Sequence, residues 1–144
     1  MSESKLIAVL GGTGNLGGGL AGRWLQAGYR VVIGSRNIEK AQQAAAELTE
    51  VLKTRGFFNI NVEAADNRAA AAAASIVVLT VPFAHHESTL KDVRDVVQGK
   101  ILVDVTVPLV PPKVARVQLS RALLDKLPRI FLAKALMLFL HFKT

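Results

Sequence analysis

Residues 12–17 have the glycine spacing of a phosphate-binding loop and read Gly12-Thr13-Gly14-Asn15-Leu16-Gly17. They follow an apolar run, residues 5–10, that is typical of a buried strand, and they lead into an expected helix at 15–27. In such a loop the glycines permit a tight turn, close approach of a pyrophosphate, and close packing of the helix. The helix would direct its free N–H groups at that anion. The sequence therefore predicts a dinucleotide site here.

A glycine-rich turn without a ligand is the alternative for this loop. It leaves Gly18 and Gly19 unexplained, because each glycine early in a helix costs roughly 0.5–1 kcal/mol relative to alanine. We expect these two glycines to permit close approach by the cofactor or by another segment of protein.

The residues after the second expected strand, 30–33, distinguish the two nicotinamide dinucleotides. NAD sites usually carry Asp or Glu about 20 residues after the loop, where the carboxylate binds the ribose 2′-hydroxyl. Here no carboxylate follows the strand; Ser35, Arg36 and Lys40 offer a hydroxyl, a planar guanidinium and an ammonium. These groups donate to a 2′-phosphate, so we predict NADP. The alternative makes Arg36 a solvated loop residue and Ser35 a helix cap.

Thr80, Val81 and Pro82 end the clearest buried strand of the sequence, expected at 75–81. In a dinucleotide-binding fold this turn lies near the nicotinamide, and the ring of Pro82 stiffens it. Phe83 is expected either beside the nicotinamide or in the core under the loop.

His85 and His86 follow directly. On a helix they point about 100° apart, so both cannot bind one metal ion. We expect surface or capping histidines, unless one lies near the hydride acceptor. We assign no catalytic residue and expect no metal site. An alcohol dehydrogenase usually needs an acid or base, whereas hydride exchange between two cofactors needs mainly the alignment of two rings.

Strands alternate with helices over residues 1–118, which we predict to be an NADP-binding domain. The expected strands are 5–10, 30–33, 59–62, 75–81 and 100–105, and the expected helices are 15–27, 37–54, 68–74 and 85–97. Asp66 or Asn67 would cap the third helix, and prolines after the fifth strand break the pattern. The alternation predicts an α/β fold, a Rossmann-type doubly wound parallel sheet that binds ligands at the carboxyl ends of its strands.

Residues 119–144 form a leucine-rich basic tail with a single acidic residue, Asp125. We predict an atypical apolar helix there, which is either buried against another part of the protein or prone to associate. The most apolar stretch, 130–142, is shorter than the roughly 20 residues that span a bilayer, so we expect no membrane span. Its apolar character favours self-association into a homo-oligomer.

The composition limits the remaining classes of function. The chain has 144 residues, 51% of them hydrophobic, and no cysteine, which suits one folded domain in a reducing compartment. No signal peptide is evident, so we expect a cytoplasmic protein. The net charge of +7 comes without a basic run interleaved with aromatics, so we expect no nucleic-acid partner.

Three segments together resemble one enzyme family: residues 7–17, residues 34–41 with their Gly-Ser-Arg and Glu-Lys-Ala, and residues 78–82, Val-Leu-Thr-Val-Pro. They resemble the NADPH-dependent coenzyme F420 reductases, or F420H2:NADP oxidoreductases, over residues 6–118. The resemblance implies an oxidoreductase that moves hydride between NADP(H) and the deazaflavin coenzyme F420. It implies pyrophosphate contacts at Thr13, Gly14, Asn15 and Leu16, 2′-phosphate contacts at Ser35 and Arg36, and Val81 and Pro82 near the nicotinamide.

The tail departs from this family. The change of character after about residue 118 is typical of a truncation or a frameshift. Two alternatives therefore stay open: a truncated NADP-binding module with little or no activity, and the cofactor domain of another reductase with an imine or ferric acceptor.

Overall fold

Five parallel strands form the central sheet of the computed structural model, which describes residues 5–105, 109–110 and 113–117. The strands are β1 (Leu6–Leu10), β2 (Arg30–Ser35), β3 (Val62–Asp66), β4 (Ile76–Leu79) and β5 (Ile101–Asp104), in the spatial order β3-β2-β1-β4-β5. The helices are α1 (Asn15–Gln26), α2 (Ile38–Thr54), α3 (Asn67–Ala73) and α4 (His86–Val93), with a short 3-10 helix η1 (Phe83–His85) before α4. The predicted doubly wound sheet is confirmed.

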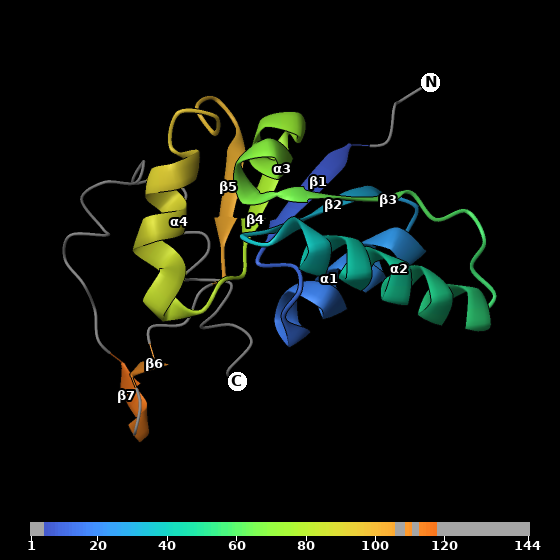
Figure 1. Cartoon of the computed structure of the whole chain (residues 1–144), viewed down its shortest axis with the longest axis horizontal. Coiled ribbons are helices and arrows are strands. Elements are labelled where there is room, and N and C mark those ends of the chain that lie inside the picture. Colours follow the sequence, from blue (N-terminus) through green and yellow to red (C-terminus); the bar gives the residue numbers. More distant parts are fainter. Residues whose placement is uncertain (1–4, 106–108, 111–112, 118–144) are drawn as a thin grey trace.

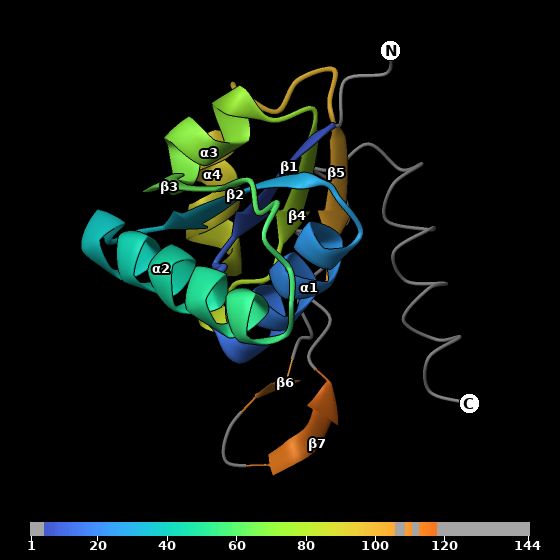
Figure 2. The same ribbon diagram turned by 90° about the vertical axis from the view of Figure 1, so that its right-hand side faces the viewer.

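The two faces of the sheet are covered by different helices (Figures 1 and 2). Side chains of β1 alternate between them, as a strand requires. Ile7 and Val9 join the core under α1 and α2, whereas Ala8 and Leu10 join the core under α3 and α4. Because both faces are buried, the inner strands β1 and β4 read as continuous apolar runs.

The largest differences from the predicted boundaries are in β3 and α4; the other elements begin and end within two residues of the prediction. The strand expected at 59–62 begins at Val62 and ends at Asp66. Its partner is β2, and the pairing runs from Val31–Val62 to Ser35–Asp66, so Ala64 and Ala65 lie in the strand despite the low strand propensity of alanine. The helix expected at 85–97 ends at Val93, and a hydrogen-bonded turn follows.

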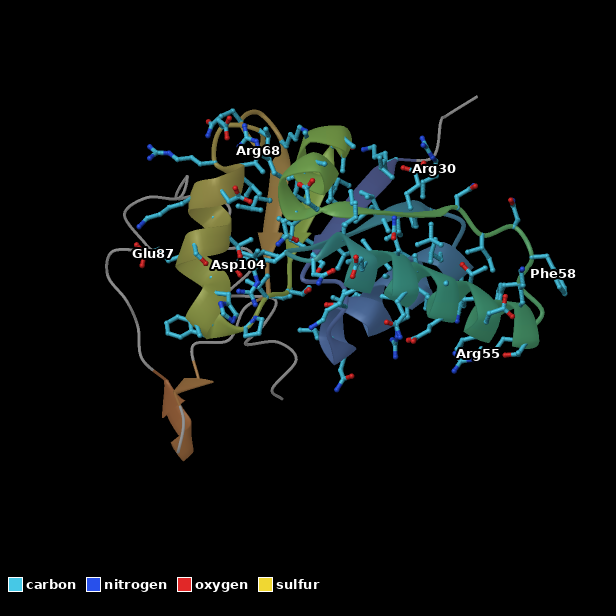
Figure 3. All side chains as sticks on the ribbon, viewed as in Figure 1. Arg30, Arg55, Phe58, Arg68, Glu87 and Asp104 are labelled. Atoms are coloured by element: carbon cyan, nitrogen blue, oxygen red, sulfur yellow. The ribbon has the colours of Figure 1, made fainter. Side chains whose placement is uncertain are left out.

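Arg68 joins the start of α3 to the last turn of α4 and the segment after it (Figure 3). Its guanidinium donates to the carbonyl oxygen of Asp92 at 2.7 Å and pairs with the carboxylate of Asp95. The hydrogen bond from Arg68 lowers the pKa of the Asp95 carboxyl below its usual value. Both side chains are exposed, so this pair contributes little to stability.

Beyond the sheet, β6 (Leu109–Val110) and β7 (Lys113–Val117) form an antiparallel pair that we did not expect. The prolines at 108, 111 and 112 break the pattern, but 111 and 112 fall in the connection between the two strands. The predicted helix over 119–144, and the self-association inferred from it, lie outside the described residues. Within the described ranges, no helix is long and apolar enough to cross a membrane.

Candidate dinucleotide-binding site

The carboxyl ends of β1, β2 and β4 meet at one edge of the sheet. Backbone hydrogen bonds join their turns: the N–H groups of Gly11 and Gly12 donate to the carbonyl oxygen of Gly34 at 3.0 and 3.1 Å. On the other side of β1, the N–H of Thr80 donates to the carbonyl oxygen of Leu10 at 2.9 Å. The three segments singled out in the sequence therefore form one surface.

The glycine loop is closed on its inner side and open on its outer side. A β-carbon on Gly12 would lie 2.9 Å from a side-chain carbon of Ile33, and one on Gly17 would lie 2.8 Å from the Cα of Gly12. A β-carbon on Gly14 would meet nothing nearer than the carbonyl oxygen of Gly11, at 3.5 Å. The first and third glycines thus serve packing, while the second faces open space where a ligand can approach.

Helix α1 begins without a side-chain cap. Its N-cap is Gly14, and its first turn contains no acidic residue. The N–H groups of a first turn have no partners within the helix. Thr13, Asn15 and Leu16 around them are exposed. This arrangement leaves donors and the positive end of a 12-residue helix available to an anion.

Ser35 and Arg36 lie at the end of β2, beside the loop. Ser35 is buried, and its Oγ accepts a hydrogen bond from the N–H of Asn37 at 3.2 Å. The N-cap of α2 is Asn37, whose side chain accepts from the N–H of Lys40, also at 3.2 Å. The Ser35 hydroxyl can still donate its hydrogen, and both Arg36 and Lys40 are exposed. The end of β2 and the first turn of α2 therefore carry one buried hydroxyl and two exposed cations.

The residues that follow β4 pack mainly against the glycine loop and are only partly exposed to solvent. The Thr80 hydroxyl donates to the carbonyl oxygen of Leu10 at 2.8 Å, and Val81 is buried against Gly11. Pro82 is exposed and Phe83 is half-buried. Of the predicted residues here, Pro82 is the most exposed, Thr80 is half-buried and Val81 is buried.

His85 reaches Arg36 across the glycine loop. Two guanidinium nitrogens of Arg36 lie 3.3 and 3.4 Å from Nδ1 and Nε2 of His85. Both contacts are hydrogen bonds between side chains, so Arg36 after β2 and His85 after β4 are joined across the site.

His86 is buried, contrary to the prediction of a surface or capping histidine. His86 is only 2% exposed to solvent. Its Nε2 lies 2.5 Å from Oδ2 of Asp104, at the end of β5. Among the described residues, Nδ1 of His86 has no hydrogen-bond partner. Asp104 is the last residue of β5, and its carboxylate faces α4 (Figure 3). His86 follows β4, and Asp104 ends β5. The carboxyl ends of these adjacent parallel strands meet at the same edge of the sheet, so the two residues are brought together by the strand order.

The family model described as "NADP oxidoreductase coenzyme F420-dependent" matches residues 6–108. The F420-dependent NADP reductase of Methanothermobacter thermautotrophicus is 50% identical over 103 residues, which are 72% of this chain and 43% of the relative. That of Methanocaldococcus jannaschii is 42% identical over 103 residues, 72% of this chain and 45% of the relative. The chain thus spans less than half the length of these curated relatives.

Solved structures agree with the fold. A crystal structure from Arthrobacter sp. FB24, described as a candidate F420-dependent NADP reductase, superposes with a TM-score of 0.62 at 25% identity, covering 83% of this chain and 52% of the other. The L-lactate dehydrogenase of Enterococcus mundtii gives 0.61 at 21% identity, covering 74% and 38%, and indicates the fold alone. Together with the matched residues, the site geometry leads to one conclusion: the chain belongs to the coenzyme F420-dependent NADP oxidoreductase family.

Proposed function

We propose that this protein binds NADP(H) at the carboxyl edge of its sheet and takes part in hydride transfer between NADP(H) and coenzyme F420. The observation that carries the proposal is the open start of α1 beside Ser35 and Arg36. One feature offers donors to a pyrophosphate, and the other offers donors to a 2′-phosphate, at adjacent strand ends.

The residues fit a dinucleotide phosphate. A β-carbon at Gly14 would occupy open space, so a pyrophosphate can lie against the backbone there. Thr13, Asn15 and Leu16 would surround it as the first turn of α1 begins. The 2′-phosphate would lie at Ser35, Arg36 and Lys40, where no carboxylate repels it.

When bound, NADP(H) supplies the hydride chemistry, and the chain supplies binding and orientation. The glycine loop fixes the pyrophosphate, and the end of β2 fixes the adenosine phosphate. Both contacts orient the nicotinamide toward the end of β4, near Pro82. Coenzyme F420 as the second substrate is supported by the relatives, which are named F420-dependent NADP reductases.

Arg36→Ala tests the cofactor assignment. We expect the dissociation constant of NADPH to rise about tenfold or more, because hydrogen bonds to charged groups contribute about 1.5–3 kcal/mol and 1.4 kcal/mol is about a factor of ten. The NADH constant should stay unchanged. Arg55→Ala is the matched control, since Arg55 is exposed and follows α2 at its far end (Figure 3). Fluorescence titration of the wild-type chain that shows NADH binding as tightly as NADPH contradicts the NADP assignment.

Turnover distinguishes the reaction from the alternatives. NADPH oxidation is followed spectrophotometrically with coenzyme F420, with a cyclic imine and with ferric chelate. Of these three acceptors, we expect only coenzyme F420 to support NADPH oxidation. NADPH binding without turnover of any acceptor favours a binding module, and turnover of the imine or ferric acceptor favours another reductase.

A further inference from the structure

We propose that His85 is a positioning residue for Arg36: its ring accepts a hydrogen bond from the guanidinium and holds that group ready for the 2′-phosphate of NADP(H). The inference rests on the proposed function, because it requires the phosphate at the end of β2. It adds a residue from the other side of the glycine loop that acts through Arg36 and need not touch the phosphate itself.

The contact between Arg36 and His85 joins two strand ends that flank β1. The residues are 49 positions apart in the sequence, and they meet because β2 and β4 lie on either side of β1. Two guanidinium nitrogens lie 3.3 and 3.4 Å from the two ring nitrogens. A guanidinium only donates, whereas a neutral imidazole has an accepting nitrogen in either tautomer, so the ring is the acceptor. Arg36 is therefore restrained by a partner from another strand end.

The guanidinium keeps donors for a phosphate while His85 holds it. A guanidinium has five N–H groups, two on each terminal nitrogen and one on Nε. At most one hydrogen of each terminal nitrogen can point at the ring, so the second hydrogen of each and the Nε hydrogen remain for a phosphate. Arg36 is exposed, so a ligand can approach these groups. His85 can thus orient Arg36 without competing with the ligand.

His85 is itself held more firmly than Arg36. Its ring is half-buried, and its N–H donates to the carbonyl oxygen of Pro82 at 2.9 Å. Its carbonyl oxygen accepts from the hydroxyls of Ser88 and Thr89 at 3.1 and 2.7 Å. Among the residues that the structure describes, the Arg36 guanidinium hydrogen-bonds to His85 alone. Ordering a long side chain on binding lowers affinity, and a restraint already present in the free protein removes part of that loss.

A double-mutant cycle tests whether His85 acts through Arg36. NADPH and NADH are titrated by fluorescence against wild type, His85→Leu, Arg36→Ala and the double variant, with far-UV circular dichroism to verify folding. We expect His85→Leu to weaken NADPH binding about 2- to 10-fold, as the ordering of one long side chain requires, and to leave NADH unchanged. In the Arg36→Ala background the same change should have no further effect on NADPH.

Two further variants serve as rescue and control. His85→Gln keeps a side-chain acceptor, so it should bind NADPH more tightly than His85→Leu does. Lys91→Gln removes a cation of α4 that pairs with Glu87 at 3.1 Å, and it should change the affinity for neither dinucleotide.

The outcomes distinguish this inference from the function on which it rests. If wild-type protein does not prefer NADPH over NADH, the proposed function fails. If it does, but His85→Leu binds NADPH as tightly as wild type or more tightly, the inference is overturned. Additive losses in the double variant also overturn it, because His85 would then act independently of Arg36. So does an equal loss of NADPH and NADH, or a His85→Gln variant no better than His85→Leu.

Discussion

Helices α1, α2 and α3 each begin just after a parallel strand, yet they begin differently. Asn37 caps α2 and Asp66 caps α3, and each side chain accepts from a backbone N–H of the first turn. Helix α1 begins at Gly14, which has no side chain to do this. A side chain therefore hydrogen-bonds to the first turn of α2 and of α3, whereas the first turn of α1 has no such partner and can receive a ligand.

The difference supports placing the proposed site at α1 and not at the neighbouring helices. A side-chain cap stabilises a helix start by about 1 kcal/mol relative to alanine, so a helix without such a cap is less stable. The same is true of the glycines early in α1. A bound anion on the first turn restores the missing interactions.

Among the variants that test this comparison, Gly17→Ala should have the largest effect on the free energy of unfolding. Its β-carbon would lie 2.6 Å from Oγ1 of Thr80 and 2.9 Å from the carbonyl oxygen of Gly11. Backbone atoms cannot move aside easily, so we expect a loss of about 1–3 kcal/mol in the free energy of unfolding, together with weaker NADPH binding. Urea denaturation measures the first and fluorescence titration the second.

Gly19→Ala is the matched control for that variant. A β-carbon there meets nothing within 4 Å, so it should leave stability equal or raise it by up to about 1 kcal/mol. If Gly17→Ala proves as stable as Gly19→Ala, the loop is not closed on its inner side as described.

Gly14→Asp should give α1 the kind of start that α3 has. There is room for the side chain, and a carboxylate at a helix start is favourable, so the free energy of unfolding should rise by a few tenths to about 1 kcal/mol. NADPH should bind about 100-fold more weakly, because the carboxylate occupies and repels the phosphate position. Thermal denaturation and NADPH titration on one sample give both values. A variant that retains wild-type affinity contradicts the placement of the pyrophosphate.

Asp66→Ala should have the smallest effect and complete the comparison. It removes the acceptor of the 2.8 Å hydrogen bond from the N–H of Ala69. We expect the free energy of unfolding to fall by about 1 kcal/mol, with no change in NADPH affinity, as measured by the same two methods. A large loss of NADPH binding would mean that α3 also belongs to the site.

Local patterns predicted the order of the elements and the glycine loop, because turns, caps and strand polarity depend on residues close in sequence. The start of β3 was misplaced because its alanines carry no strand signal, and its position is fixed by pairing with β2. The pairs His86–Asp104 and Arg36–His85 were not predicted, although their residues were read one by one. They join positions 18 and 49 apart, so only the strand order brings them together.

The carbonyl oxygen of Gly34 holds the loop through two backbone hydrogen bonds, and the side chains at 35 and 36 come directly after it. The anchoring of the loop therefore does not depend on which side chains follow. Gly34 itself is constrained, since a β-carbon there would lie 2.9 Å from Oδ1 of Asn67. If Ser35 and Arg36 select the coenzyme as proposed, their side chains can be exchanged to change that preference while the backbone that anchors the loop stays the same.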